Sequence, residues 1–205
     1  MLIRRTFLAG TGLLLGLALA LGAAAPARAQ DGNAASFVKQ TGEQLVQVID
    51  SSVSDAVKRQ ELQRIVDRDL DVTGIARFAL GPFWRTATPQ QRQEYTALFH
   101  EVLLNSITGK LGEYSGVRFV VGRTTPTDGG TAVHTVIYRP SHEPTNVEWL
   151  VVNVNGAPKI ADVIAEGTSL RITQRSDYQS YLRHNGDSVP TLIRALRQQV
   201  AQANG

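Results

Sequence analysis

The sequence predicts an α+β domain in which helices pack on one face of an antiparallel sheet of four to five strands. Apolar residues recur at helical spacing between residues 37 and 111, and short Val- and Ile-rich segments separated by turn residues follow up to residue 165. Helical spacing then returns from residue 169 towards the C-terminus. Helices, then strands, then helices again are the order of an α+β domain. The 205 residues are 42% hydrophobic and 19% charged, which excludes wholesale disorder.

The N-terminus has the pattern of a secretory signal peptide. Arg4 and Arg5 precede residues 6–27, which carry no charge, and Ala27-Arg28-Ala29 places small residues at the two positions that a signal peptidase recognises. We therefore predict that residues 1–29 are a signal peptide and that the mature chain begins at Gln30. An uncleaved membrane anchor is the alternative, since about 20 apolar residues can span a bilayer. Much of this stretch is Gly and Ala, which favour insertion only weakly.

The same N-terminus indicates an exported protein with a neutral mature chain. Arg4-Arg5-Thr6-Phe7-Leu8 also resembles a twin-arginine signal, although paired arginines occur in general secretory signals too. Removal of residues 1–29 takes away three of the 21 basic residues and none of the 18 acidic ones, so the net charge falls from +3 to zero. A neutral chain has no overall field to attract nucleic acid. We expect a periplasmic protein with a single domain over residues 30–205.

Six helices are predicted from apolar spacing and from helix-capping signals. Thr88-Pro89-Gln90-Gln91 combines a capping threonine, a proline at the first helical position and a glutamine three residues after the threonine. Ser54, Asp71 and Ser169 are suited to cap three further helices. The predicted helices cover residues 37–49, 54–66, 71–80, 88–111, 169–183 and 192–200.

Four strands are predicted between the long helix and the helix that begins at residue 169. They cover residues 117–121, 131–139, 147–154 and 159–165. The dipeptide Asn155-Gly156 between the last two is a strong hairpin signal, because both of its residues tolerate a positive φ. The strands therefore form an antiparallel meander.

The residues that usually carry catalysis or metal binding do not form a recognisable set. The chain has no cysteine, which excludes disulfides, thiolate metal sites and a cysteine nucleophile. Ser169 lacks the Gly-x-Ser-x-Gly pattern of a hydrolase nucleophile. No histidine pair has metal-ligand spacing. We therefore predict no catalytic residue, no metal, no cofactor and no enzymatic activity. The four histidines are His100, His134, His142 and His184.

The acidic candidates for a site are a run of three alternating aspartates and one aspartate on a predicted strand. Asp67, Asp69 and Asp71 alternate as calcium ligands can, but the glycine and the distant glutamate of a calcium loop are missing. A helix cap explains Asp71 better, and a solvated surface explains the other two. Asp162, on a predicted strand, is a candidate buried acid with no partner visible in the sequence.

The apolar residues of the third strand lie on both of its faces. Val147, Trp149 and Val151 occupy one alternation, whereas Leu150 and Val152 occupy the other. An antiparallel sheet with one face in water alternates more cleanly. The sheet is therefore either covered on both sides or forms the wall of a cavity for an apolar ligand, and the pattern leaves both possibilities open.

Several motifs occur in order along the mature chain. The first is Leu70–Arg85, with the sequence LDVTGIARFALGPFWR, followed by Thr88-Pro89-Gln90-Gln91-Arg92 and by Phe99. A second block is Asp162–Leu170, with the sequence DVIAEGTSL. Over residues 37–197 the chain resembles the MlaC family of periplasmic phospholipid-binding proteins, also called the toluene-tolerance auxiliary family. A subfamily encoded with hopanoid genes shares the first block.

This resemblance implies a lipid carrier of the periplasm. Such proteins shuttle a phospholipid between an outer-membrane lipoprotein–porin complex and an inner-membrane ABC transporter, which maintains the lipid asymmetry of the outer membrane. The resemblance also implies a lipid cavity between sheet and helices, with the headgroup facing water. A binding protein for another apolar ligand such as a hopanoid is the alternative, and a hydrolase on the same scaffold is a third possibility.

For such a cavity we predict a lining from the aromatic pair, the long helix and one sheet face. The predicted lipid-binding residues are Phe83, Trp84, Leu98, Val102, Leu103, Ile107, Val147, Trp149 and Val151.

Overall fold

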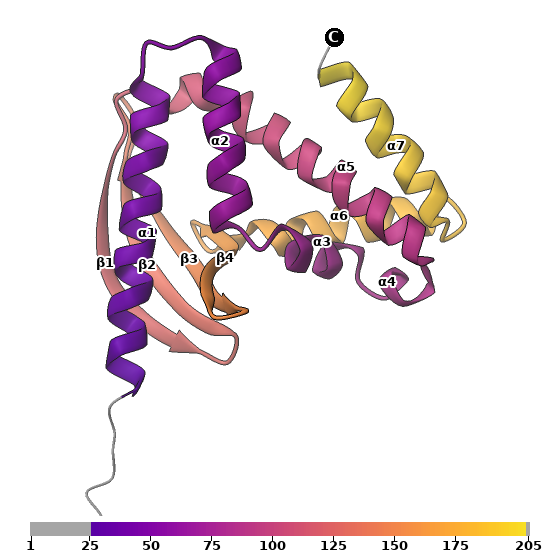
Figure 1. Cartoon of the computed structure of the whole chain (residues 1–205), viewed down its shortest axis with the longest axis horizontal. Helices are drawn as coiled ribbons and strands as arrows, with labels where there is room; N and C mark the ends of the chain where they lie inside the picture. The colour runs from indigo at the N-terminus through magenta and orange to yellow at the C-terminus, as the bar shows by residue number, and fades with distance from the viewer. Residues whose placement is uncertain (1–25, 204–205) are drawn as a thin grey trace, which may run out of the picture.

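The computed structural model describes residues 26–203 of the chain (Figure 1). The predicted signal peptide, with Arg4 and Arg5, lies outside the described residues, except that residues 26–29 belong to the first helix. Within the described part, seven α-helices and a five-stranded antiparallel sheet confirm the predicted α+β fold. Among these helices, none combines the length and the apolar character needed to cross a bilayer.

The helices begin at the predicted capping residues. Asp71 Oδ1 accepts a hydrogen bond of 3.0 Å from the backbone N–H of Gly74, and Ser169 Oγ accepts one of 3.1 Å from Ile172. Thr88 and Gln91 form the complete capping box, with hydrogen bonds of 2.9 and 3.2 Å. The helices are α1 (Pro26–Asp50), α2 (Asp55–Asp69), α3 (Val72–Leu80), α4 (Phe83–Thr86), α5 (Pro89–Thr108), α6 (Leu170–His184) and α7 (Val189–Ala203), with a 3-10 turn at Leu111–Tyr114.

The sheet has the strand order β1-β2-β3-β4-β5, so each strand pairs with its neighbours in the sequence. Asn155 and Gly156 have φ values of 53° and 85°, as a two-residue hairpin turn requires. The first strand continues past the predicted end at residue 121, because a register shift between Val121 and Thr124 lets it keep pairing with the second. The strands are β1 (Arg118–Thr127), β2 (Gly130–Tyr138), β3 (Thr145–Val154), β4 (Ala157–Ala165) and β5 (Thr168–Ser169).

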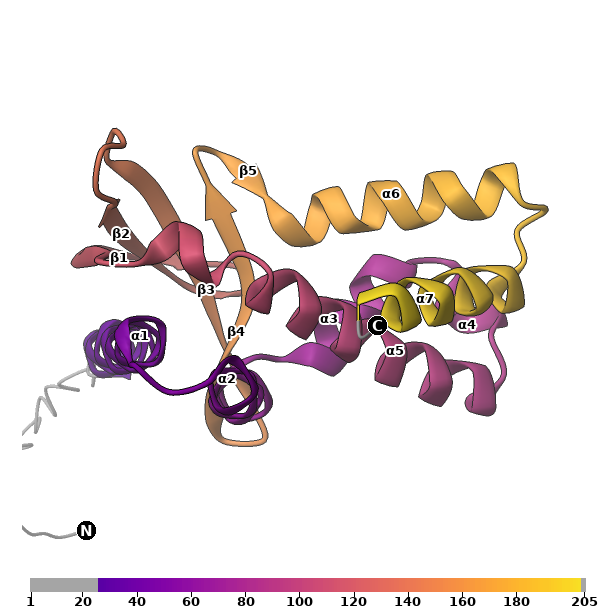
Figure 2. The ribbon, with the colours of Figure 1, turned by 90° about the horizontal axis from the view of Figure 1, so that it is seen from above.

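Helix α1 lies along one face of the sheet, over β1 and β2, with α2 beside it (Figures 1 and 2). Val38 of α1 is buried in one cluster with Val133 of β2 and Val151 of β3. The approach of α1 to β1 is close at Gly42, where a Cβ atom would lie 2.4 Å from Phe119 Cζ. A glycine at this position therefore lets the helix come close to the sheet.

Helices α3 to α7 form a second core beside the β4 edge of the sheet, away from α1 (Figure 2). Tyr95 of α5 and Tyr178 of α6 meet edge to face in it, with ring centroids 6.2 Å apart. The described residues thus form two hydrophobic clusters, one between α1 and the sheet and one among the helices. Helices α2, α3 and α6 all contact β4 and connect the two.

Candidate functional site

A groove of about 840 Å³ lies among α2, α3 and α5. Its volume is within the range of roughly 300–1,000 Å³ that is typical of ligand sites. It combines apolar and charged side chains, which suits a ligand with an apolar body and a polar end. The apolar lining residues are Leu70, Val72, Trp84, Ala97 and Leu98, and the titratable ones are Asp67, Asp71, Arg92, His100, Glu101 and Lys159.

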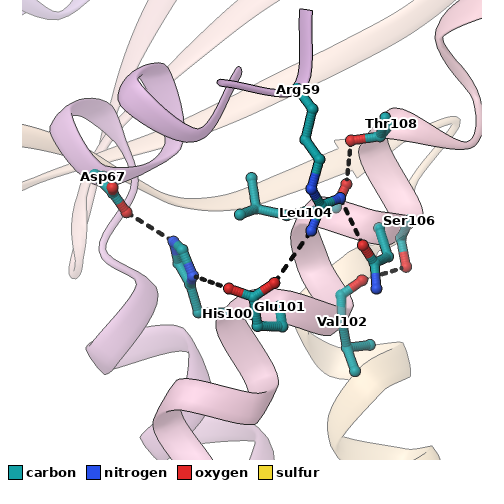
Figure 3. A network of polar contacts seen from close by, with 9 residues as sticks. Arg59, Asp67, His100, Glu101, Val102, Leu104, Ser106 and Thr108 are labelled. Carbon is teal, nitrogen blue, oxygen red and sulfur yellow. Dashed lines mark hydrogen bonds and ion pairs between the residues drawn. The ribbon is translucent and has the colours of Figure 1, made fainter. Parts of the chain in front are cut away.

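The acidic residues at the α2 end of the groove already have basic partners (Figure 3). His100 Nε2 lies 2.7 Å from Asp67 Oδ1, and His100 Nδ1 lies 3.8 Å from Glu101 Oε1. Arg59 of α2 forms an ion pair of 3.1 Å with Glu101 and donates a 2.6 Å hydrogen bond to Asn105 Oδ1. These contacts tie α2 to α5, so this end of the groove is a network of side chains that satisfy one another.

Lys159, from the start of β4, is held at the same end. Its ammonium group donates hydrogen bonds to the carbonyl oxygens of Asp67, at 3.2 Å, and Arg68. These carbonyls belong to the last turn of α2, where the helix dipole favours a positive charge.

A smaller hollow of about 160 Å³ lies on the sheet. Val120, Val136 and Ile164 are among its lining residues, with His134 Nδ1 3.5 Å from Glu148 Oε1 across two strands. Its volume is below that of ordinary ligand sites, so the groove among the helices is the better candidate for a large ligand.

The nine predicted lipid-binding residues fall into three groups. Trp84 and Leu98 line the groove. Val102 is buried in the core of helices α3 to α7, Phe83 and Leu103 pack against that core, and Ile107 is half-buried near the end of α5. Val147, Trp149 and Val151 share one sheet face, as their alternation predicts, and the last two pack with α1. The structure therefore does not gather all nine around one hollow.

The lining residues that the sequence did not single out come from the junction after α2 and from α3, α5 and β4. Leu70 and Val72 lie in the Leu70–Arg85 motif, so the motif is the only signal that could have pointed to them. No sequence feature pointed to Lys159 as a lining residue. Its contact with α2 arises only because the folded sheet brings β4 beside the end of that helix.

The candidate acidic residues have structural partners. Asp69 is buried, so its predicted place on a solvated surface was wrong, and it accepts a hydrogen bond of 2.8 Å from Thr41. Asp71 caps α3 as predicted. Asp162 is buried, with 5% of its surface exposed, and it accepts hydrogen bonds from Ser169 Oγ at 2.5 Å and from the backbone N–H of Arg171 at 3.1 Å. Asp162 therefore fastens the start of α6 to β4.

Two comparisons with known proteins match this chain over most of its length. The sequence model of the MlaC protein family matches residues 39–198. A solved structure of the phospholipid-binding protein from Ralstonia solanacearum, in complex with a phospholipid, superposes with a TM-score of 0.73 at 21% sequence identity. The match covers 84% of this chain and 99% of the other. At this identity, the likeness establishes a shared fold.

Proposed function

This chain belongs to the MlaC family, and on that basis we propose that it binds a phospholipid and carries it through the periplasm. The observation that carries the proposal is the family match together with a shared fold whose Ralstonia example holds a phospholipid. The protein acts as a binding and transport protein rather than an enzyme.

The proposed partners are the two complexes that the family resemblance implies. The protein takes and delivers lipid at an outer-membrane lipoprotein–porin complex and at an inner-membrane ABC transporter. A carrier is needed because each methylene of an acyl chain gains roughly 0.8 kcal/mol on burial, so a bare lipid crosses water too slowly. The physiological result is maintenance of outer-membrane lipid asymmetry.

The groove among α2, α3 and α5 is the proposed entrance for the lipid. It follows α5 from Arg92 to Glu101 and is open to the surface of the molecule, as an entrance must be. Trp84, Ala97 and Leu98 supply apolar contacts along it.

The protein purified from its periplasm should contain lipid. Mass spectrometry of an organic extract tests the proposal: a phospholipid near one per protein supports it, whereas a hopanoid would favour the alternative ligand. An extract without any lipid, together with no uptake from phospholipid vesicles, would contradict it.

The groove itself is tested by filling it. Ala97 is exposed on α5 and lines the groove, so Ala97→Trp blocks the groove without entering a core. We expect an unchanged melting temperature and little bound phospholipid. The matched control is Ala201→Trp, on the exposed end of α7, which should carry a full lipid load. A full load in Ala97→Trp would place the lipid elsewhere.

Export is tested at the N-terminus. We propose cleavage after Ala29, so N-terminal sequencing of periplasmic protein should begin at Gln30. Lysine at both Arg4 and Arg5 should abolish export by the twin-arginine route. Unchanged periplasmic levels would show that the general secretory route is used.

A further inference from the structure

We propose that Arg92 binds the phosphate of the lipid headgroup at the α4 end of the groove. The inference rests on the proposed function, because it assigns a part of the ligand to one side chain of the same groove.

Arg92 is held in place by the backbone of α4. Its Nε donates a 2.7 Å hydrogen bond to the carbonyl oxygen of Trp84, and its Nη2 donates one of 3.2 Å to the carbonyl oxygen of Arg85. The guanidinium carbon lies 5.6 Å from the centroid of the Trp84 ring, within the range of a cation–π contact. The guanidinium is therefore oriented before any ligand arrives.

Arg92 lines the groove, and its guanidinium keeps unused donors. An arginine has five N–H donors, and the two bonds to carbonyls leave both Nη1 donors and one Nη2 donor free for a ligand. Among residues 33–203, whose side chains the structure describes, no carboxylate forms an ion pair with Arg92. A positive charge that is fixed, half-buried and without an anionic partner favours an anionic ligand, and a planar guanidinium suits a phosphate.

The acidic side chains of the groove leave Arg92 available. Asp67 and Glu101 are engaged by His100 and Arg59, and Asp71 caps α3. His100 is eight residues further along α5 than Arg92, which corresponds to about 12 Å. A phosphate at Arg92 would thus lie at the opposite end of the groove from this charged network, and it would leave Ala97 and Leu98, between the two ends, to the apolar part of the lipid.

The test compares two lipids with identical acyl chains, phosphatidic acid and diacylglycerol, which differ by the phosphate. We expect the wild-type protein to bind phosphatidic acid at least tenfold more tightly. Arg92→Gln should lower this ratio about tenfold, which equals about 1.4 kcal/mol, while its affinity for diacylglycerol stays within about twofold. Arg92→Lys, which keeps the charge but loses the planar group, should give an intermediate ratio.

Arg85→Gln is the matched control. It removes the same charge from an exposed position of α4 that does not line the groove, so its ratio should equal that of the wild type. An equal fall in both glutamine variants, or no fall in Arg92→Gln, would overturn the inference. A wild-type protein that prefers neither lipid would overturn it even if Arg92→Gln fails to fold. Failure of the wild type to bind any lipid would instead reject the proposed function.

Discussion

Thr41 Oγ1 on α1 donates a 2.8 Å hydrogen bond to Asp69 Oδ2 at the end of α2, and both residues are at least 97% buried. Arg68 completes the site with two bonds of 2.7 Å to the same carboxylate. This hydrogen bonding raises the pKa of the Arg68 guanidinium above its usual value, so the arginine stays charged. A buried carboxylate therefore joins the helix on the sheet to the helix at the groove.

Loss of the Thr41 hydroxyl should weaken this joint. Thr41→Val keeps the shape of the side chain but leaves a buried carboxylate oxygen with one fewer donor, which costs about 1–3 kcal/mol. Thr41→Ser retains the hydroxyl and should be clearly less destabilised. Urea unfolding measures both, and equal stabilities of the two variants would show that the hydrogen bond contributes nothing.

Tyr95 and Tyr178 allow a matched pair of deletions in one cluster. The Tyr95 hydroxyl donates a 3.0 Å hydrogen bond to the carbonyl oxygen of Ala76, whereas the Tyr178 hydroxyl has no hydrogen-bond partner among residues 33–203, whose side chains are described. Tyr95→Phe should therefore lower the unfolding free energy by about 1 kcal/mol, and Tyr178→Phe should leave it unchanged or raise it. Chemical denaturation measures both unfolding free energies. A Tyr178→Phe protein that is less stable than Tyr95→Phe would refute the assignment of the hydrogen bond to Tyr95.

The same two residues predict a loss of stability at high pH. Burial raises the pKa of Tyr95 and Tyr178 well above that of an exposed tyrosine, which is about 10. Because folding favours the neutral hydroxyls, their contribution is complete below about pH 10 and falls as the pH rises further, since only the unfolded chain ionises. Unfolding free energies between pH 8 and 11.5 should show this fall, and replacement of both tyrosines by phenylalanine should reduce its slope.

Val151 tests how the sheet face under α1 is filled. It is 6% exposed and packs with Val38 and Val133, so an ionised Val151→Glu side chain would lose water without gaining a partner, at a cost of several kcal/mol. Val152 lies on the opposite face of β3 and pairs in register with Lys159, so Val152→Glu should have a melting temperature close to that of the wild type. A Val151→Glu protein that melts like the wild type but carries no lipid phosphate would instead place Val151 at the wall of a hydrated cavity.

The secondary structure was predictable wherever its cause is local. The capping box at Thr88 and the turn at Asn155-Gly156 each depend on residues within a few positions of one another, and both formed as predicted. The end of β1 was misplaced, because its continuation to Thr127 depends on pairing with β2 across a register shift. Helix α1 likewise starts at Pro26 rather than at residue 37, since residues outside the periodic stretch extend it.

By itself the sequence determined the α+β class, the helix caps, the order of the strands and the family resemblance. Each of these depends on residues that are close together in the sequence or on contiguous motifs. Only the tertiary structure decided which side chains share a surface. Lys159 meets the carbonyl of Asp67 across 92 positions, and His100 meets the Asp67 carboxylate across 33. Apolar spacing predicts that Leu98 and Val151 face the protein interior. It does not predict which of the two separate hydrophobic clusters each of them joins. Periodicity specifies a buried face, whereas the partner of that face depends on how whole helices pack.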